Sequence, residues 1–205
     1  ARMKALEEAF DSRAVRLGLT ASPDWNEHRQ LAHFFPDLIH RMTIPEAVDL
    51  GLLAKPKIFV HDVDVDGSEI TLLPGGDFDD EELGRLMSSG PFLEWARRCR
   101  YDDLENRKLG TLFCCKSAQQ AYDLVAYLNA HLPAGSPEPG LVLYGIASRK
   151  RREATLAFEA GELDTLIQVG ILLEGWNAPR CKLLIDLSPT TSLVRATQKF
   201  FRPLT

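Results

Sequence analysis

The stretch TLFCCKSAQQAYDLVAYL, residues 111–128, decides the fold of this chain. Its first five residues form an apolar run of strand length, and Ser117 follows as a residue that can cap a helix. Apolar side chains then recur at helical spacing, at Ala121, Leu124, Val125 and Leu128. The stretch therefore predicts a buried strand followed by an amphipathic helix, which is the repeating unit of a parallel α/β sheet.

The same plan repeats toward the C-terminal end. A loop rich in proline and glycine, LPAGSPEPG, separates the first helix from the next strand. The expected elements after it are strands at 141–145, 164–170 and 182–187 and a helix at 148–160 that Gly161 ends. Parallel sheets of this kind bind ligands at the carboxyl ends of their strands. We expect Gly145 and the ranges 175–179 and 188–192 at that edge.

Residues 1–60 and 61–108 show a different pattern. In the first range, AVRLGL at 14–19 predicts a strand with helix on both sides and no complete sheet around it. We therefore expect residues 1–60 to be the tail of another domain. We expect residues 61–108 to connect this tail to the sheet domain at 109–205 and also to pack on a domain. The run DVDVDG is similar to the start of a calcium-binding loop, but Leu73 stands where a bidentate glutamate is required. Its alternation instead predicts a strand with one solvated face.

Composition is that of an ordinary protein that folds in water. The 205 residues are 45% apolar, which is enough for a core in one large or two small domains. No apolar run approaches the roughly 20 residues that span a bilayer, and the charged start differs from a signal peptide, so we expect a cytoplasmic protein without a membrane partner. The cysteines show neither Cys-x-x-Cys spacing nor a nearby histidine pattern, which predicts buried thiols without a metal site. They are Cys99, Cys114, Cys115 and Cys181.

The net charge of −5 is unevenly distributed along the chain. Residues 1–60 carry eight basic and eight acidic side chains, residues 61–105 carry four and thirteen, and residues 106–205 carry twelve and eight. The last range includes four consecutive basic residues at 149–152. This cluster indicates either a surface that faces phosphate or a solvated helix face.

Several motifs, in order, resemble those of superfamily 2 helicases, in particular the group that contains type III restriction subunits and related DNA-repair helicases. RLGLTASP resembles motif III, and TIPEAVDLGLLAKP resembles the passage that follows it. The opening stretch resembles motif IV, LEGWNAP resembles motif V, and SPTTSLVRATQKFFRP resembles motif VI. GIASRKRREATLAFEAGELDTLIQV resembles the passage between motifs IV and V. The resemblance covers nearly the whole chain and implies a RecA-like parallel sheet flanked by helices at 109–205, preceded at 1–60 by the tail of a first RecA-like domain.

The resemblance also implies an ATP site. By this resemblance, Gly175 is the position of close approach to the nucleotide, Glu174 supports its turn, and Asn177 takes the place of an aspartate that meets the sugar or bonds across the cleft. Gln198 and Arg202 face the triphosphate from motif VI. Arg202 is the candidate catalytic residue, because a guanidinium presents fixed donors to the charge that develops during phosphoryl transfer. A surface cation is the alternative interpretation of Arg202.

A nucleic-acid site follows from the same resemblance. Its predicted residues are Thr20, Ser22, Lys116, Gly145 and Arg152. The implied partners are a nucleic acid, DNA in preference to RNA, and the first RecA-like domain of the same protein. The implied cofactors are ATP and Mg²⁺, which residues outside this chain would chiefly bind.

Some residues depart from the family pattern. Asn177 cannot act as an anion as the usual aspartate does, although its amide can still bond to a hydroxyl. Val169 stands in place of a threonine that contacts phosphate. In motif VI, either Phe201 and Thr205 replace a glycine and a second arginine, or Arg202 and the proline after it match the end of the motif with a short deletion.

The sequence contains neither a phosphate loop of the form GxxxxGK[ST] nor an acidic magnesium motif. We therefore expect the chain to be part of a longer protein and to be inactive as an ATPase on its own. Two hypotheses follow from the residues. In the first, the chain is part of an ATP-dependent helicase or translocase. In the alternative, it is a degenerate helicase-like module that binds nucleic acid or a protein without hydrolysing ATP.

Overall fold

The computed structural model describes residues 17–18, 35, 37–63, 66–68, 70–74, 76–172, 176, 179–191, 196 and 199. The chain separates into two compact units, Ala1–Met42 and Thr43–Thr205. Apart from Leu17 and Gly18, the predicted strand at 14–19 lies outside the described residues, as do Thr20 and Ser22. The fold below is that of the second unit.

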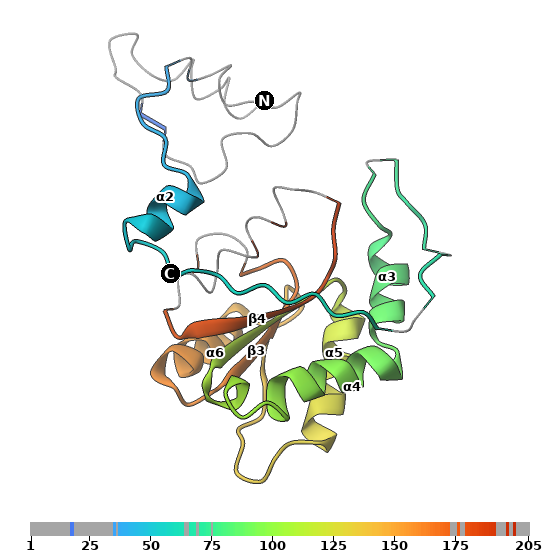
Figure 1. Cartoon of the computed structure of the whole chain (residues 1–205). Helices are drawn as coiled ribbons and strands as arrows, with labels where there is room; N and C mark the ends of the chain where they lie inside the picture. The colour runs from blue at the N-terminus through green and yellow to red at the C-terminus, as the bar shows by residue number, and fades with distance from the viewer. Residues whose placement is uncertain are drawn as a thin grey trace. The chain divides into compact units, whose positions relative to one another are not determined.

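A four-stranded parallel sheet forms the centre of this unit (Figure 1). Its strands are β1 (Gly110–Cys115), β2 (Gly140–Val142), β3 (Thr165–Gln168) and β4 (Cys181–Leu187), in the spatial order β2-β3-β1-β4. All three pairings are parallel. The predicted α/β class, with a parallel sheet flanked by helices, is confirmed.

Two helices follow strands as the sequence predicts. Helix α5 (Ala118–Ala130) begins after Ser117, whose hydroxyl accepts a hydrogen bond from the backbone N–H of Gln120. Helix α6 (Ser148–Ala160) ends at Gly161, which has a φ of 83°. This left-handed conformation is strained for residues with a side chain, so a glycine suits the position.

Strands β2 and β3 are shorter than the predicted 141–145 and 164–170. The side chain of Gln168 provides the physical reason, because its Oε1 accepts hydrogen bonds from the backbone N–H groups of Ile171 and Leu172 at 3.1 and 3.4 Å. These bonds turn the chain after Gln168, so β2 loses its partner beyond Val142. Residues 143–146 then form a turn.

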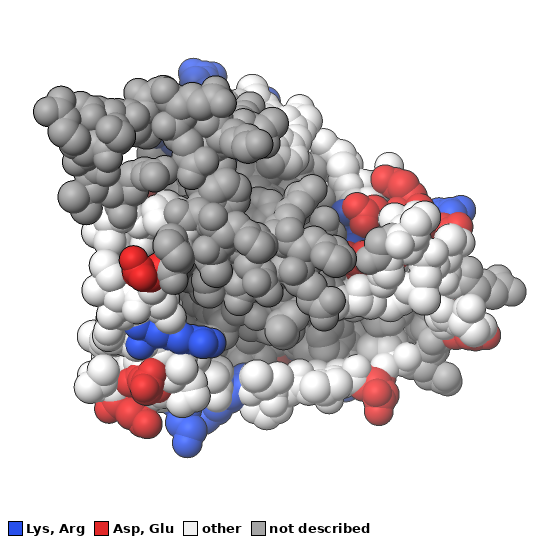
Figure 2. All heavy atoms as spheres, turned by 90° about the horizontal axis from the view of Figure 1, so that it is seen from above, with Lys and Arg blue, Asp and Glu red and all other residues white. Residues whose placement is uncertain are grey.

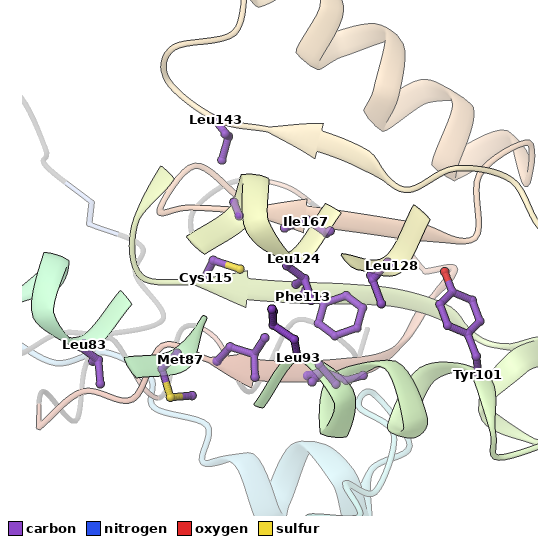
Figure 3. Close-up of a cluster of buried hydrophobic side chains, with 14 residues drawn as sticks. Leu83, Met87, Leu93, Tyr101, Phe113, Cys115, Leu124, Leu128, Leu143 and Ile167 are labelled. Carbon is purple, nitrogen blue, oxygen red and sulfur yellow. The ribbon is translucent and has the colours of Figure 1, made fainter. Parts of the chain in front are cut away.

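The core lies on both faces of the sheet, because neighbouring strand residues point to opposite sides. On one face, Phe113 packs with Leu124 and Leu128 of α5 and with Ile167 of β3 (Figure 3). On the other face, Leu112 and Leu166 pack with Phe158 of α6. Cys114, Cys115 and Cys181 are buried thiols, as predicted, and Cys99 is half-buried.

The range 61–108, which we call the acidic range, contributes directly to this core. Helices α3 (Asp80–Met87) and α4 (Gly90–Tyr101) precede the short 3-10 helix η2 (Asn106–Lys108). Buried side chains of α3 and α4 belong to the same cluster as Phe113. They are Leu83, Met87, Leu93, Ala96 and Tyr101. The expectation that this range packs on a domain therefore holds for residues 80–101, which contribute to the core of the sheet domain.

A close helix contact fixes the position of α3. A β-carbon at Gly84 would lie 2.5 Å from Oγ of Ser117 and 3.0 Å from its Cβ. Only a glycine permits this approach, which brings the N-terminal end of α3 close to the carboxyl end of β1.

The strand predicted from the alternation of valine and aspartate is wrong for the described part of that run, which contains no strand at 57–63 or 66–68. Phe59 and Val60, just before the run, are exposed, and no described strand pairs with this segment. The segment makes one isolated antiparallel bridge farther on, between Leu72 and Phe78. Helix α2 (Ile44–Asp49) lies before it, with Thr43 and Glu46 forming a capping box. No helix formed by the described residues is long and apolar enough to cross a membrane.

Candidate functional site

The candidate site is the edge of the sheet where the four strands end. Because the strands are parallel, the residues that follow them lie along one edge. Lys116 follows β1, the turn with Gly145 follows β2, and Thr190 and Thr191 come shortly after β4. The predicted position of Gly145 at this edge is confirmed, as is that of residues 188–191, and Lys116 lies at the same edge. The binding roles of Lys116 and Gly145 stay predictions.

Lys116 faces two carboxylates of the acidic range. Its Nζ lies 3.1 Å from Oδ1 of Asp80 and 3.7 Å from Oδ2 of Asp77. The Lys116 side chain is 8% exposed, whereas that of Asp80 is 62% exposed. The ammonium is therefore neutralised within the chain, and it can reach a phosphate only after these contacts change.

Asp77 also binds the segment after β4. Its Oδ2 accepts a hydrogen bond from Oγ1 of Thr190 at 2.8 Å, and its Oδ1 accepts one from the backbone N–H of Thr191 at 3.2 Å. The Thr191 hydroxyl donates to the carbonyl oxygen of Gly76 at 2.8 Å. The carboxylate thus joins the ends of β1 and β4, and Thr190 lies 113 positions from it in the sequence.

The pKa of Asp77 reports how well this environment suits an anion. Burial alone raises the pKa of the carboxyl, but the hydrogen bonds from Thr190, Thr191 and the backbone of Phe78, together with the charge of Lys116, outweigh burial and lower it. The group is an anion at neutral pH, and its surroundings favour negative charge.

A buried ion pair lies at the end of β4. Nζ of Lys199 is 2.8 Å from Oδ2 and 3.0 Å from Oδ1 of Asp186, and it also donates to the carbonyl oxygen of Ser188 at 2.5 Å. Oδ1 of Asp186 accepts hydrogen bonds from the backbone N–H and the hydroxyl of Ser188. This network attaches Lys199, within the predicted motif VI, to the sheet.

Two buried amide side chains shape the same edge. Gln120 donates from Nε2 to the carbonyl oxygen of Leu187 at 2.9 Å and accepts from the backbone N–H of Lys116 at 2.7 Å, so it links the ends of β4 and β1. Gln168 turns the chain after β3, and its Nε2 contacts Sγ of Cys114 at 3.1 Å. Sequence reasoning missed both residues, although a glutamine at a buried position of an apolar pattern is a recognisable signal.

The basic cluster at 149–152 begins helix α6, beside the turn after β2. Arg151 is half-buried and donates from Nη1 to the carbonyl oxygens of Leu143 and Tyr144 at 3.1 and 3.2 Å. Arg149 lies 3.5 Å from a carboxylate oxygen of Glu153. Lys150 and Arg152 are exposed. One of the four cations therefore has a structural role. On the face shown in Figure 2, small groups of basic and of acidic side chains lie among uncharged surface.

The predicted ATP-binding residues lie outside the described residues. They are Gly175, Asn177, Gln198 and Arg202, and Glu174 and the motif VI positions Phe201 and Thr205 are likewise outside. Val169 is described, and its side chain packs against the core.

Trp176 is described, and it contacts the last turn of α6. Its ring centroid lies 5.9 Å from that of Phe158, and its Nε1 donates to Oε1 of Glu159 at 3.1 Å. Pro179 lies just before β4, at the amino ends of the strands. The prediction that 175–179 lies at the carboxyl edge is thus wrong for Trp176 and Pro179, because the chain must return to the amino ends to enter a parallel strand.

No family model matches the chain, and no curated protein matches its sequence. Among solved structures, Dbp5 of S. cerevisiae bound to RNA and ADP BeF3 is 11% identical with a TM-score of 0.43, and the match covers 60% of this chain and 29% of Dbp5. The Hef helicase domain of Pyrococcus furiosus is 18% identical with a TM-score of 0.44, over 55% of this chain and 22% of that one. The chain spans less than a third of either protein. A likeness this distant does not bear on function.

Proposed function

We propose that the chain is part of an ATP-dependent nucleic-acid helicase or translocase and contributes the second RecA-like domain. One observation carries the proposal. The segments that resemble motif IV and the passage between motifs IV and V fold as strand, turn and helix, and their turns lie at one edge of a parallel sheet. This edge is where such sheets hold ligands.

In this proposal the edge faces the phosphates of a nucleic-acid backbone, with DNA the expected polymer. Exposed cations at the start of α6, Lys150 and Arg152, would contact phosphates without reading the sequence. ATP would supply the energy for closing and reopening the cleft against a first RecA-like domain. The described residues contain no group of three or more histidine, cysteine or acidic side chains that could hold a metal, so we assign them no part in binding Mg²⁺.

The nucleic-acid surface is tested with Lys150→Gln/Arg152→Gln in the full-length protein. Loss of two phosphate contacts should reduce the slope of log K against log salt by about 1.4 for single-stranded DNA, since each contact contributes about 0.7. The matched control is Arg98→Gln/Lys108→Gln, which removes two exposed cations that precede β1. An equal change of slope in both variants would make the cluster at 149–152 a solvated face.

The motor and the non-hydrolysing module differ in what they require of Arg202. In a motor, Arg202→Ala should lower ATP turnover by the full-length protein about 10²-fold or more while DNA affinity changes little. Arg202→Lys should restore little ATP turnover, because a point charge cannot reproduce the paired donors of a guanidinium. Turnover within about threefold of the parent would remove Arg202 from the site. The module is the second candidate, and Val169 favours it, because its side chain packs against the core at the position of a threonine that contacts phosphate.

A further inference from the structure

A short loop of the acidic range reaches the carboxyl edge of the sheet. We call residues 71–78 the acidic loop. The bridge between Leu72 and Phe78 closes it, and the backbone N–H of Leu73 donates to the carbonyl oxygen of Asp77 at 2.8 Å. Gly76 occupies its turn with a φ of 78°, a left-handed conformation that favours glycine. This geometry presents the Asp77 carboxylate at the end of the loop.

Three donors to the Asp77 carboxylate come from the described residues of the sheet edge. They are the hydroxyl of Thr190, the backbone N–H of Thr191 and the ammonium of Lys116. A hydroxyl, a backbone N–H and an ammonium that converge on one anionic group are also what a phosphate oxygen requires. The lowered pKa of Asp77 agrees with an environment that stabilises negative charge.

We propose that Lys116, Thr190 and Thr191 form a phosphate-binding site, and that Asp77 of the acidic loop occupies it in the structure described here. The ligand that displaces Asp77 is a phosphodiester of the nucleic-acid backbone, an identification that rests on the proposed function. The acidic loop thus acts as an internal competitor, and nucleic acid gains Lys116 only when the loop moves away.

The loop is built so that this movement costs little. Leu72 is 60% exposed and Leu73 is 42% exposed, so these two residues bury little apolar surface that would be lost on moving. Phe78 packs partly buried against the core and stays in place, so the movement is confined to the residues that precede it. Its contacts with the edge are chiefly hydrogen bonds, which a phosphate can replace one for one. Helix α3, which follows the loop, stays fixed through the close contact between Gly84 and Ser117.

Asp77→Asn tests the proposal in the whole 205-residue chain. The substitution removes the competing charge and keeps an oxygen that can accept from Thr190, so the fold is retained. Affinity for a fluorescent single-stranded DNA oligonucleotide, measured by anisotropy, should rise about tenfold, the effect of one charge-assisted hydrogen bond. Adding Lys116→Gln to Asp77→Asn should abolish the gain. The control is Glu81→Gln, which changes the net charge equally at an exposed position of α3 and should leave affinity within about twofold.

A second readout uses inorganic phosphate in place of nucleic acid. At matched ionic strength, replacing chloride by phosphate should raise the melting temperature of Asp77→Asn more than that of the parent chain, Glu81→Gln or Asp77→Asn/Lys116→Gln. Phosphate stabilisation of Asp77→Asn without DNA binding by any variant would support the anion site and contradict the proposed function.

Two results would overturn the inference. The first is equal phosphate stabilisation in all four proteins, since general salt effects would then explain it. The second is an equal gain in DNA affinity from Asp77→Asn and Glu81→Gln, which would show that the acidic range acts only through its net charge.

Discussion

Lys199→Met should destabilise the sheet domain by removing the cation of a buried ion pair. The Lys199 side chain is 4% exposed and that of Asp186 is 17% exposed, with 2.8 Å between Nζ and Oδ2. Methionine keeps most of the volume of lysine, so the substitution leaves packing nearly intact and removes the charge. The carboxylate of Asp186 then lies largely buried without a cation.

The size of the effect follows from this burial. Removing one partner of a buried ion pair costs about 3–5 kcal/mol. Asp186 keeps some exposure and two hydrogen bonds from Ser188, which places the expected loss at the lower end, at about 3 kcal/mol. For a domain of this size that loss lowers the melting temperature by about 6–12 °C.

Urea unfolding followed by circular dichroism measures this loss. The control is Lys108→Met, whose ion pair with Glu105 is exposed and should contribute no more than about 1 kcal/mol. Asp186→Asn in the Lys199→Met background should recover part of the loss, because no buried charge is then left alone. Two results would refute the interpretation that the ion pair of Lys199 and Asp186 attaches the segment after β4. One is a loss below about 1 kcal/mol for Lys199→Met, and the other is strict additivity of the losses from Lys199→Met and Asp186→Asn.

Two other substitutions test the packing and the charges of the acidic range. Gly84→Ala should lower the free energy of unfolding by about 1–2 kcal/mol in a urea titration, because its methyl group would meet Ser117. Gly90→Ala, which also lies in a helix but meets no atom within 4 Å, should be neutral or slightly stabilising, and an equal loss in both variants would contradict the close contact. Hydrogen bonds from Arg97 lower the pKa of Glu94 to about 2; burial opposes this shift and a hydrogen bond from Tyr127 adds to it. The Glu94 carboxylate therefore stabilises the fold above its ordinary pKa of 4.5, and this stabilisation is lost as the pH falls toward 2. Urea midpoints measured from pH 6 to pH 2 should therefore fall less steeply for Glu94→Gln than for the parent chain, and parallel curves would exclude this role.

The sequence predicted the local elements well, because each depends on neighbouring residues. Ser117 as a cap, the bounds of α6 and its end at Gly161 are all properties of short segments. The lengths of β2 and β3 were not predictable, because they depend on a side chain. Gln168 turns the chain through its own amide, and periodicity does not show which backbone groups that amide bonds.

The candidate site was predictable only in part, for a related reason. Lys116 and Gly145 follow strands, so the topology alone located them. The contact of Asp77 with Thr190 joins residues 113 positions apart, and nothing in the sequence near either residue indicates it. The acidic range was expected to pack on a domain, but the sequence did not indicate that side chains of α3 and α4, such as Leu83 and Leu93, join the same core as β1.

Net charge is therefore a poor guide to where this chain would meet an anion, and the pairing of individual charges is a better one. At the β1 and β4 side of the edge, the cation Lys116 is neutralised by two carboxylates of the acidic range. At the β2 side, Lys150 and Arg152 are exposed at the start of α6. Among the described residues of the edge, Lys150 and Arg152 present positive charge to solvent, so we expect a polyanion to be attracted first to the β2 side. It can extend to Lys116 only by displacing Asp77, so the two halves of the edge would bind in sequence, and an Asp77→Asn substitution should make that second step independent of the first.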